Sequence, residues 1–167
     1  MDQLTTTLVA GMIIGLGATL TFDGWALTLK HAFKIPPSNI CLVGRWMLYM
    51  REGVFTHVNL AAAKPKGAEC AVGWCAHYAI GVTLAGVFLV WAGPQWLRHP
   101  TLLPAIVFGV VTVVAPFFVM QPAFGLGFAA SKTAHPGRAR LRSMMNHLAF
   151  GAGLYLFAQL VHRLGLT

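Results

Sequence analysis

The strongest constraint on this chain is a run of about 24 residues, Cys70–Gly93, that contains no Lys, Arg, Asp or Glu. A run of this length is enough for a helix to cross a bilayer core of roughly 30 Å. Gly73, His77 and Gly81 are four residues apart, so a helix places them on one face, and small residues let a neighbouring backbone approach closely. We therefore expect a transmembrane helix whose histidine, His77, points into protein.

The composition agrees with a membrane protein. Of 167 residues, 57% are hydrophobic and only 10% are charged, whereas soluble domains carry about 25% charged residues. The formal net charge of +8 would suggest nucleic-acid binding in a soluble chain. Here the basic residues lie between apolar runs, as orientation in a membrane requires. We expect the lipid bilayer as a partner and no nucleic acid.

Three further runs are long and apolar enough to span, which gives expected spans at about 4–29, 70–93, 102–128 and 143–164. Apolar residues recur at helical spacing in the first long connection, which predicts an amphipathic interfacial helix over about 39–59. Pro116 and Pro122 should break the third span. The predicted fold class is all-α: an integral membrane four-helix bundle with this additional interfacial helix, in a single transmembrane domain, 1–167.

The basic residues predict the orientation. The connections between spans one and two and between spans three and four carry ten of the 12 Lys and Arg residues, and only Arg98 and Arg163 lie on the other side. The positive-inside rule then makes both of these connections cytoplasmic and both termini periplasmic. No cleavable signal is visible, because the first seven residues contain no basic residue and the following run is long enough to span.

Two smaller patterns lead to further expectations. Cys41, Cys70 and Cys75 form no metal or redox motif, and their odd number argues against a disulfide framework, so we expect packing roles. Gly11 and Gly15 form a small-residue stripe on the first span, which is a candidate contact for a second copy. We expect a homodimer on this basis.

Each predicted span places a polar side chain in the cytoplasmic third of the membrane. The first contributes Asp23, the second His77, the third Gln121, and the fourth Asn146 and His147. Polar residues at such depth are costly and usually mark a functional site, although a cap, a satisfied core histidine or an interhelical hydrogen bond explains each one alone. Arg45 on the interfacial helix is a candidate to approach Asp23.

Three kinds of chemistry fit this polar layer. Asp23, His77 and His147 are suited to relaying protons or binding a cation, which favours transport or conduction of an ion or small molecule. The same three side chains are candidate ligands of a transition metal. His77 and His147 also suit the two axial positions of haem. A structural role in a larger membrane complex is the remaining alternative. An enzyme is less expected, because no nucleophile elbow, zinc-protease or phosphate-loop motif is present.

Four short motifs carry a resemblance to a known family: FDGW around Asp23, AHYAIG in the second span, QPAFGLGFAAS, and NHLAFGAGLY. In these motifs the chain resembles a family of small bacterial inner-membrane proteins catalogued as a domain of unknown function. The resemblance covers nearly the whole chain. It implies four spans and a bacterial inner-membrane location, and it assigns no activity or catalytic residue.

Overall fold

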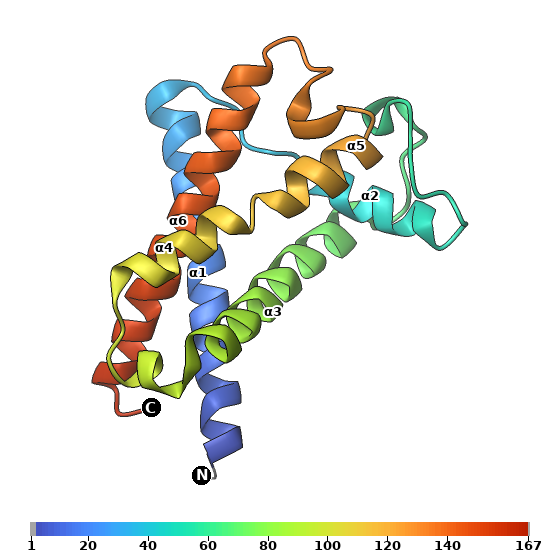
Figure 1. Cartoon of the computed structure of the whole chain (residues 1–167). Helices are drawn as coiled ribbons and strands as arrows, with labels where there is room; N and C mark the ends of the chain where they lie inside the picture. The colour runs from blue at the N-terminus through green and yellow to red at the C-terminus, as the bar shows by residue number, and fades with distance from the viewer. Residues whose placement is uncertain (1–2, 167) are drawn as a thin grey trace. The chain divides into compact units, whose positions relative to one another are not determined.

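A computed structural model describes residues 3–166 of the chain, apart from the side chains of Gln3, Leu4 and Thr6. Every regular element in these residues is helical (Figure 1). Helices α1, α3 and α6 are long, and α2, α4, α5 and the single turns η1 to η3 are short. Their bounds are α1 Gln3–Phe33, α2 Cys41–Met50, η1 Leu60–Ala62, α3 Glu69–Arg98, α4 Leu102–Val111, η2 Pro116–Met120, α5 Gln121–Ala123, η3 Phe128–Ala130 and α6 Pro136–Arg163.

Four helical stretches are long and apolar enough to cross a membrane, which confirms the predicted number of spans by length and composition. They are Thr7–Phe33, Glu69–Arg98, Leu102–Ala123 and Pro136–Arg163. Two of them are interrupted. In α3, Gly93 has φ 78° and is followed by Pro94, so the helix changes direction where the sequence predicts its end. In the third stretch, α4 ends at Val111 and Pro116 begins a π-helical turn, η2. The predicted break in the third span is therefore confirmed.

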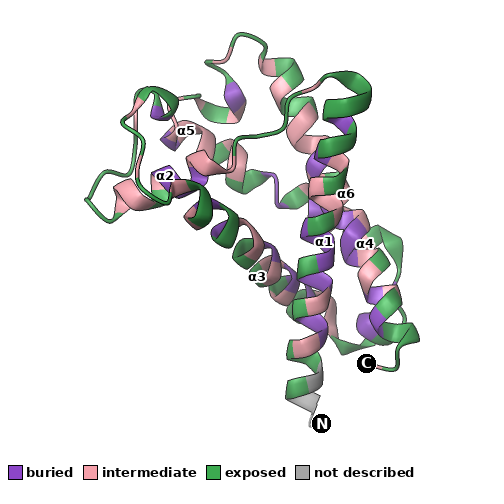
Figure 2. Cartoon of the chain, turned by 180° about the vertical axis from the view of Figure 1, so that it is seen from behind, coloured by how far each residue is buried: buried purple, intermediate pink, exposed green. Residues whose placement is uncertain are grey.

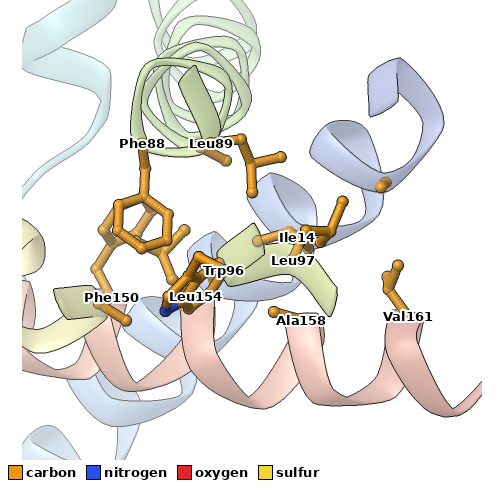
Figure 3. Close-up of a cluster of buried hydrophobic side chains, with 13 residues drawn as sticks. Ile14, Phe88, Leu89, Trp96, Leu97, Phe150, Leu154, Ala158 and Val161 are labelled. Carbon is orange, nitrogen blue, oxygen red and sulfur yellow. The ribbon is translucent and has the colours of Figure 1, made fainter. Parts of the chain in front are cut away.

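The chain divides into two compact units, which we treat separately. The first unit comprises Met1–Pro37, Tyr78–Val111 and Asn146–Thr167, and the second comprises Ser38–His77 and Thr112–Met145. Helices α3 and α6 each contribute to both units. The main buried hydrophobic cluster belongs to the first unit, where side chains of α1, α3, α4 and α6 meet. Figure 3 shows Ile14, Phe88 and Leu154, all fully or almost fully buried, within this cluster.

Small residues allow the helix backbones of the first unit to touch. A Cβ on Gly15 would lie 2.5 Å from Cα of Val82 on α3, and one on Gly109 would lie 2.6 Å from the carbonyl oxygen of His147 on α6. Gly11 faces Leu89 of α3. The Gly11 and Gly15 stripe is thus buried against a helix of the same chain, which corrects its assignment as an exposed surface for a second copy. The homodimer stays a prediction without this support.

The second unit joins α2 to the start of α3 by a disulfide between Cys41 and Cys70. The expectation that all three cysteines serve as packing residues is therefore wrong for this pair, while Cys75 is free and exposed. The two helices also pack closely on either side of Cys70: a Cβ on Gly44 would collide with the backbone of Glu69, and one on Gly73 with the backbone of Ile40. The disulfide thus closes the place where the two helices are nearest.

The predicted helix over 39–59 is shorter in the structure. Helix α2 ends at Met50, and the chain reverses through Gly53, where φ is 78°. The residues after this turn pack along the end of the third stretch, with the amide of His57 donating to the carbonyl of Ala123 at 2.8 Å. These backbone hydrogen bonds outside the helix take the place of the predicted last helical turns.

The contact between Gly15 and α3 leads to a stability prediction. Gly15→Ala should lower stability by about 1–3 kcal/mol, because its new methyl group meets the backbone of Val82, which cannot move aside as a side chain does. Gly24→Ala on the same helix is the matched control, since nothing lies within 4 Å of its Cβ position. Thermal unfolding in detergent measures both; equal stability of the two variants would contradict the packing described.

Candidate functional site

Asp23 is held by Tyr78, a residue that is not part of the predicted polar layer. The hydroxyl of Tyr78 on α3 donates to Oδ2 of Asp23 on α1 over 3.0 Å, and both side chains are partly buried in the first unit. A carboxylate in an apolar helical unit is expensive unless it is hydrogen-bonded, and the tyrosine provides one such bond without a charge. Asp23 is therefore tied to α3 and remains the one acidic side chain described in this unit.

Asn146 and His147 occupy α6 in the same unit. The ring of His147 contacts that of Phe22, the neighbour of Asp23, with the ring centres 5.8 Å apart and the planes nearly perpendicular. The imidazole is also hydrogen-bonded to the backbone of Gly109 on α4. Asn146 is 2% exposed, and its Oδ1 has no hydrogen-bond partner among the described residues. Three of the predicted site residues, Asp23, Asn146 and His147, thus belong to one unit. In this unit the Phe22–His147 contact joins α1 to α6, and the Asp23–Tyr78 hydrogen bond joins α1 to α3.

The other predicted site residues, His77, Gln121 and Arg45, belong to the second unit. The ring of His77 stands edge-on to Trp74, with ring centres 5.7 Å apart. Oε1 of Gln121 is buried without a hydrogen-bond partner in the described part of the chain. The common depth predicted for Asp23, His77, Gln121, Asn146 and His147 stays a prediction, because these residues belong to two units. A shared site of His77 with His147 stays a prediction as well.

Arg45 pairs with Glu69 rather than with Asp23, which corrects the partner suggested by the sequence. Its Nε and Nη2 donate to the two carboxylate oxygens of Glu69, each over 2.8 Å. Its Nη1 donates to the carbonyl oxygens of Leu60, Ala61 and Ala63. The hydrogen bond to Glu69 raises the pKa of Arg45, and the opposing effect of burial is smaller. All parts of the guanidinium are engaged, so Arg45 stabilises the fold of the second unit.

His57, in the connection between α2 and α3, has a ring whose two nitrogens are buried within the second unit. Neither ring nitrogen is exposed, and neither has a hydrogen-bond partner among the described residues. The imidazole packs edge-on against Tyr49 at 4.7 Å between ring centres. Lys66 in turn lies 4.1 Å above the ring of Tyr49. His57 is therefore a buried polar side chain of the second unit.

No group of three or more His, Cys, Asp or Glu side chains in residues 3–166 is arranged to hold a metal ion. Asp23, His77 and His147 do not form such a group. The transition-metal hypothesis therefore gains no support from the geometry. The haem hypothesis depends on His77 and His147, which lie in different units.

Sequence reasoning missed Tyr78, Glu69 and the Cys41–Cys70 bridge for different reasons. Tyr78 follows His77 directly, so the depth estimate that selected His77 applies to it as well. Glu69 is one of only four acidic residues and stands at the entrance of a span, which marks it as a partner for a buried cation. The disulfide joins residues 29 positions apart in no recognised motif, and the sequence contains no signal for it.

The fold and the polar side chains together define a class: an all-helical protein with four candidate membrane-spanning helices and buried polar groups between them. The chain belongs to the family described as "Protein of unknown function (DUF2938)", which matches residues 12–161. This confirms the resemblance found in the sequence motifs. No curated protein and no solved structure matches the chain.

The buried ion pair leads to a prediction with an internal control. Glu69→Gln should destabilise the protein by about 3–5 kcal/mol, because it leaves the Arg45 guanidinium, only 8% exposed, without its counter-charge. Glu52→Gln makes the same chemical change in an exposed pair with Lys66 and should cost less than about 1 kcal/mol. Thermal unfolding of the two variants compares them. Equal losses would show that the Arg45 pair is not energetically distinct.

Proposed function

We propose that this protein is a multi-pass inner-membrane protein that transports or conducts an ion through its first unit. The observation that carries the proposal is the set of polar groups inside the helical first unit, whose main buried cluster is hydrophobic. Asp23 accepts a hydrogen bond from Tyr78, His147 is bonded to the backbone of Gly109, and Asn146 Oδ1 is buried without a partner in the described chain. Such groups are costly in a membrane and are retained where a polar species must be accommodated.

The chemistry of these groups favours an ion over an uncharged solute. Carboxylate, phenol and imidazole each exchange protons, and the carboxylate also attracts cations. Trp25, two residues after Asp23, contributes a buried indole N–H that has no hydrogen-bond acceptor among residues 3–166. The indole N–H of Trp25 is a buried donor and Oδ1 of Asn146 is a buried acceptor in the same unit. Such a pair is suited to binding a hydrated ion or to passing a proton along hydrogen bonds.

The outer faces of the helices support insertion in a membrane. Leu8, Met12, Leu16 and Leu20 recur every four residues on α1, and all are exposed while the opposite face is buried. Figure 2 shows the same alternation of buried and exposed positions along α1. An exposed apolar face of this length would be unfavourable in water and is suited to lipid. The other candidate spans also expose large apolar residues, among them Val90, Leu103, Val107, Leu156 and Leu160.

The broken third stretch suits a transport role as well. Discontinuous helices free backbone carbonyl groups, which line ion paths in many transporters. In this chain α4, the π-helical turn η2 and α5 replace one continuous helix, and Pro116 and Pro122 occupy the breaks. π-Helical turns are frequent at functional sites. Both breaks lie in the second unit, and the part of the stretch that belongs to the first unit is the regular helix α4.

Ion flux in proteoliposomes tests the proposal. The purified protein should dissipate an imposed proton, Na⁺ or K⁺ gradient, followed with an ion-sensitive dye inside the vesicles. Asp23→Asn should reduce the flux at least tenfold, because it removes the one acidic side chain that the structure describes in the first unit, and Tyr78→Phe should reduce it less. Glu52→Gln is the matched control and should leave the flux unchanged, since Glu52 is exposed and paired with Lys66.

The outcomes separate the alternatives. Absence of flux of all three ions for the unsubstituted chain would contradict the proposal and favour a structural role in a larger complex. Loss of insertion or folding in Asp23→Asn, rather than loss of flux alone, would make Asp23 a structural residue. A visible absorbance band or retained metal in the purified protein would favour the haem or metal alternative at His77 and His147.

The orientation has its own test. Reporter fusions at Lys66 and Arg138 should be cytoplasmic, and fusions at Gln95 and at the C-terminus should be periplasmic, because ten of the 12 basic residues lie in the two connections assigned to the cytoplasm. Alkaline phosphatase activity and fluorescent-protein emission report the two sides. A cytoplasmic C-terminus would invert the proposed topology and move the polar groups to the opposite side of the bilayer.

A further inference from the structure

We propose that the Cys41–Cys70 disulfide is a reversible redox site that exchanges with thiol reductants of the cytoplasm. It lies in the second unit and takes no part in the transport proposed above, although its assignment to the cytoplasmic side rests on the same topology. Cys41 lies in the connection between the first two predicted spans, and Cys70 lies at the start of α3. The basic residues of this connection assign both to the cytoplasmic side. Disulfides on that side are seldom permanent, because the cytoplasm keeps thiols reduced, and those that form there are usually transient or redox-sensing.

Accessibility supports exchange. Cys70 is solvent-exposed, although residues before and after it pack closely against α2. Cys41 is less exposed, so an incoming thiolate reaches Cys70 more readily. Attack at the exposed sulfur makes Cys41 the leaving group, and access of this kind is one of the factors that set exchange rates.

The position of both cysteines favours the reduced form, in which the disulfide is open. Cys41 is the first residue of α2, and Cys70 is the second residue of α3. The amino-terminal end of a helix stabilises negative charge, and cysteines placed there react and leave as thiolates. A bridge whose reduced form is stabilised in this way is opened more easily than a buried structural disulfide.

The chemical step balances with a thiol as the only co-reactant. A thiolate attacks Sγ of Cys70, the bond to Sγ of Cys41 breaks, and Cys41 leaves as a thiolate that takes up a proton. A second thiol then attacks the mixed disulfide, releases Cys70 and forms the oxidised reductant. Two electrons and two protons pass from the two thiols to the two cysteines.

Opening the bridge leaves the second unit with a different set of constraints. The connection between the two cysteines, which are separated by 29 positions, is closed covalently in the oxidised state. In the reduced state the Arg45–Glu69 ion pair and the backbone contact at Gly44 and Gly73 still join α2 to α3. The unit therefore stays folded in both states, and the bridge adds or removes a covalent tether at the entrance of the second span.

The redox state in cells tests the proposal. The full chain carrying Cys75→Ser has only these two cysteines, and free thiols are trapped by acid and labelled with a maleimide that shifts the band on a gel. Untreated cells should show two labels per chain, a pulse of diamide should remove both, and recovery should follow when diamide is withdrawn. Cys41→Ser in the same background gives the position of a single label. The unsubstituted chain should show the same pattern displaced by one label.

A bridge that stays oxidised in untreated cells, or one that does not reopen after diamide, would overturn the proposal. A membrane-impermeant maleimide, added together with a membrane-impermeant phosphine that reduces any accessible disulfide, distinguishes this failure from a failure of the topology. Labelling only after the cells are permeabilised agrees with the cytoplasmic side, whereas labelling of intact cells places the bridge outside and overturns the proposal together with the orientation. Loss of ion flux has no bearing on either result.

Discussion

Close contact between helix backbones is the interaction on which the first unit depends. In a membrane, moving an apolar side chain from lipid to a helix interface changes its free energy little, because both surroundings are apolar. Helices therefore associate through van der Waals contact where small residues permit close approach. Gly15 against Val82, Gly109 against His147 and Gly153 against Ala18 provide such contacts between three pairs of helices. The larger buried side chains, Phe88 and Leu154 among them, fill the space that these contacts leave.

In the second unit, different interactions hold the segments together. Its connection between α2 and α3 leaves Val54, Phe55 and Val58 exposed. The segment is held instead by a disulfide, by a buried ion pair and by hydrogen bonds from Arg45 to backbone carbonyl groups. A guanidinium satisfied by a bidentate carboxylate and three carbonyl groups resists replacement, because any partial removal leaves a buried charge. Specific polar contacts thus fix a loop that hydrophobic burial alone would leave loose.

The spans could be predicted from the sequence because length and apolarity are properties of consecutive residues, as Cys70–Gly93 illustrates. The interruption at Pro116 was likewise visible, since proline removes a helix hydrogen bond wherever it stands. Partners distant in the chain were not visible. Asp23 lies 55 positions from Tyr78, and Arg45 lies 24 from Glu69. Neither spacing has a period that a single helix imposes. The same applies to His57, whose backbone amide donates to the carbonyl of the distant Ala123.

The π-helical turn at Pro116–Met120 alters how the third stretch can be interpreted. A π-helix accommodates one more residue per turn than an α-helix, and each residue of an α-helix turns the chain by roughly 100°. Residues on either side of η2 therefore face in directions that a uniform helical wheel drawn from Leu102 assigns wrongly. Deleting one residue within the turn would restore α-helical register between Ala115 and Gln121 and rotate the Gln121 side chain about the helix axis, whereas the length of the stretch would hardly change. In this segment, the number of residues determines which way the following side chains point more than it determines the length of the stretch.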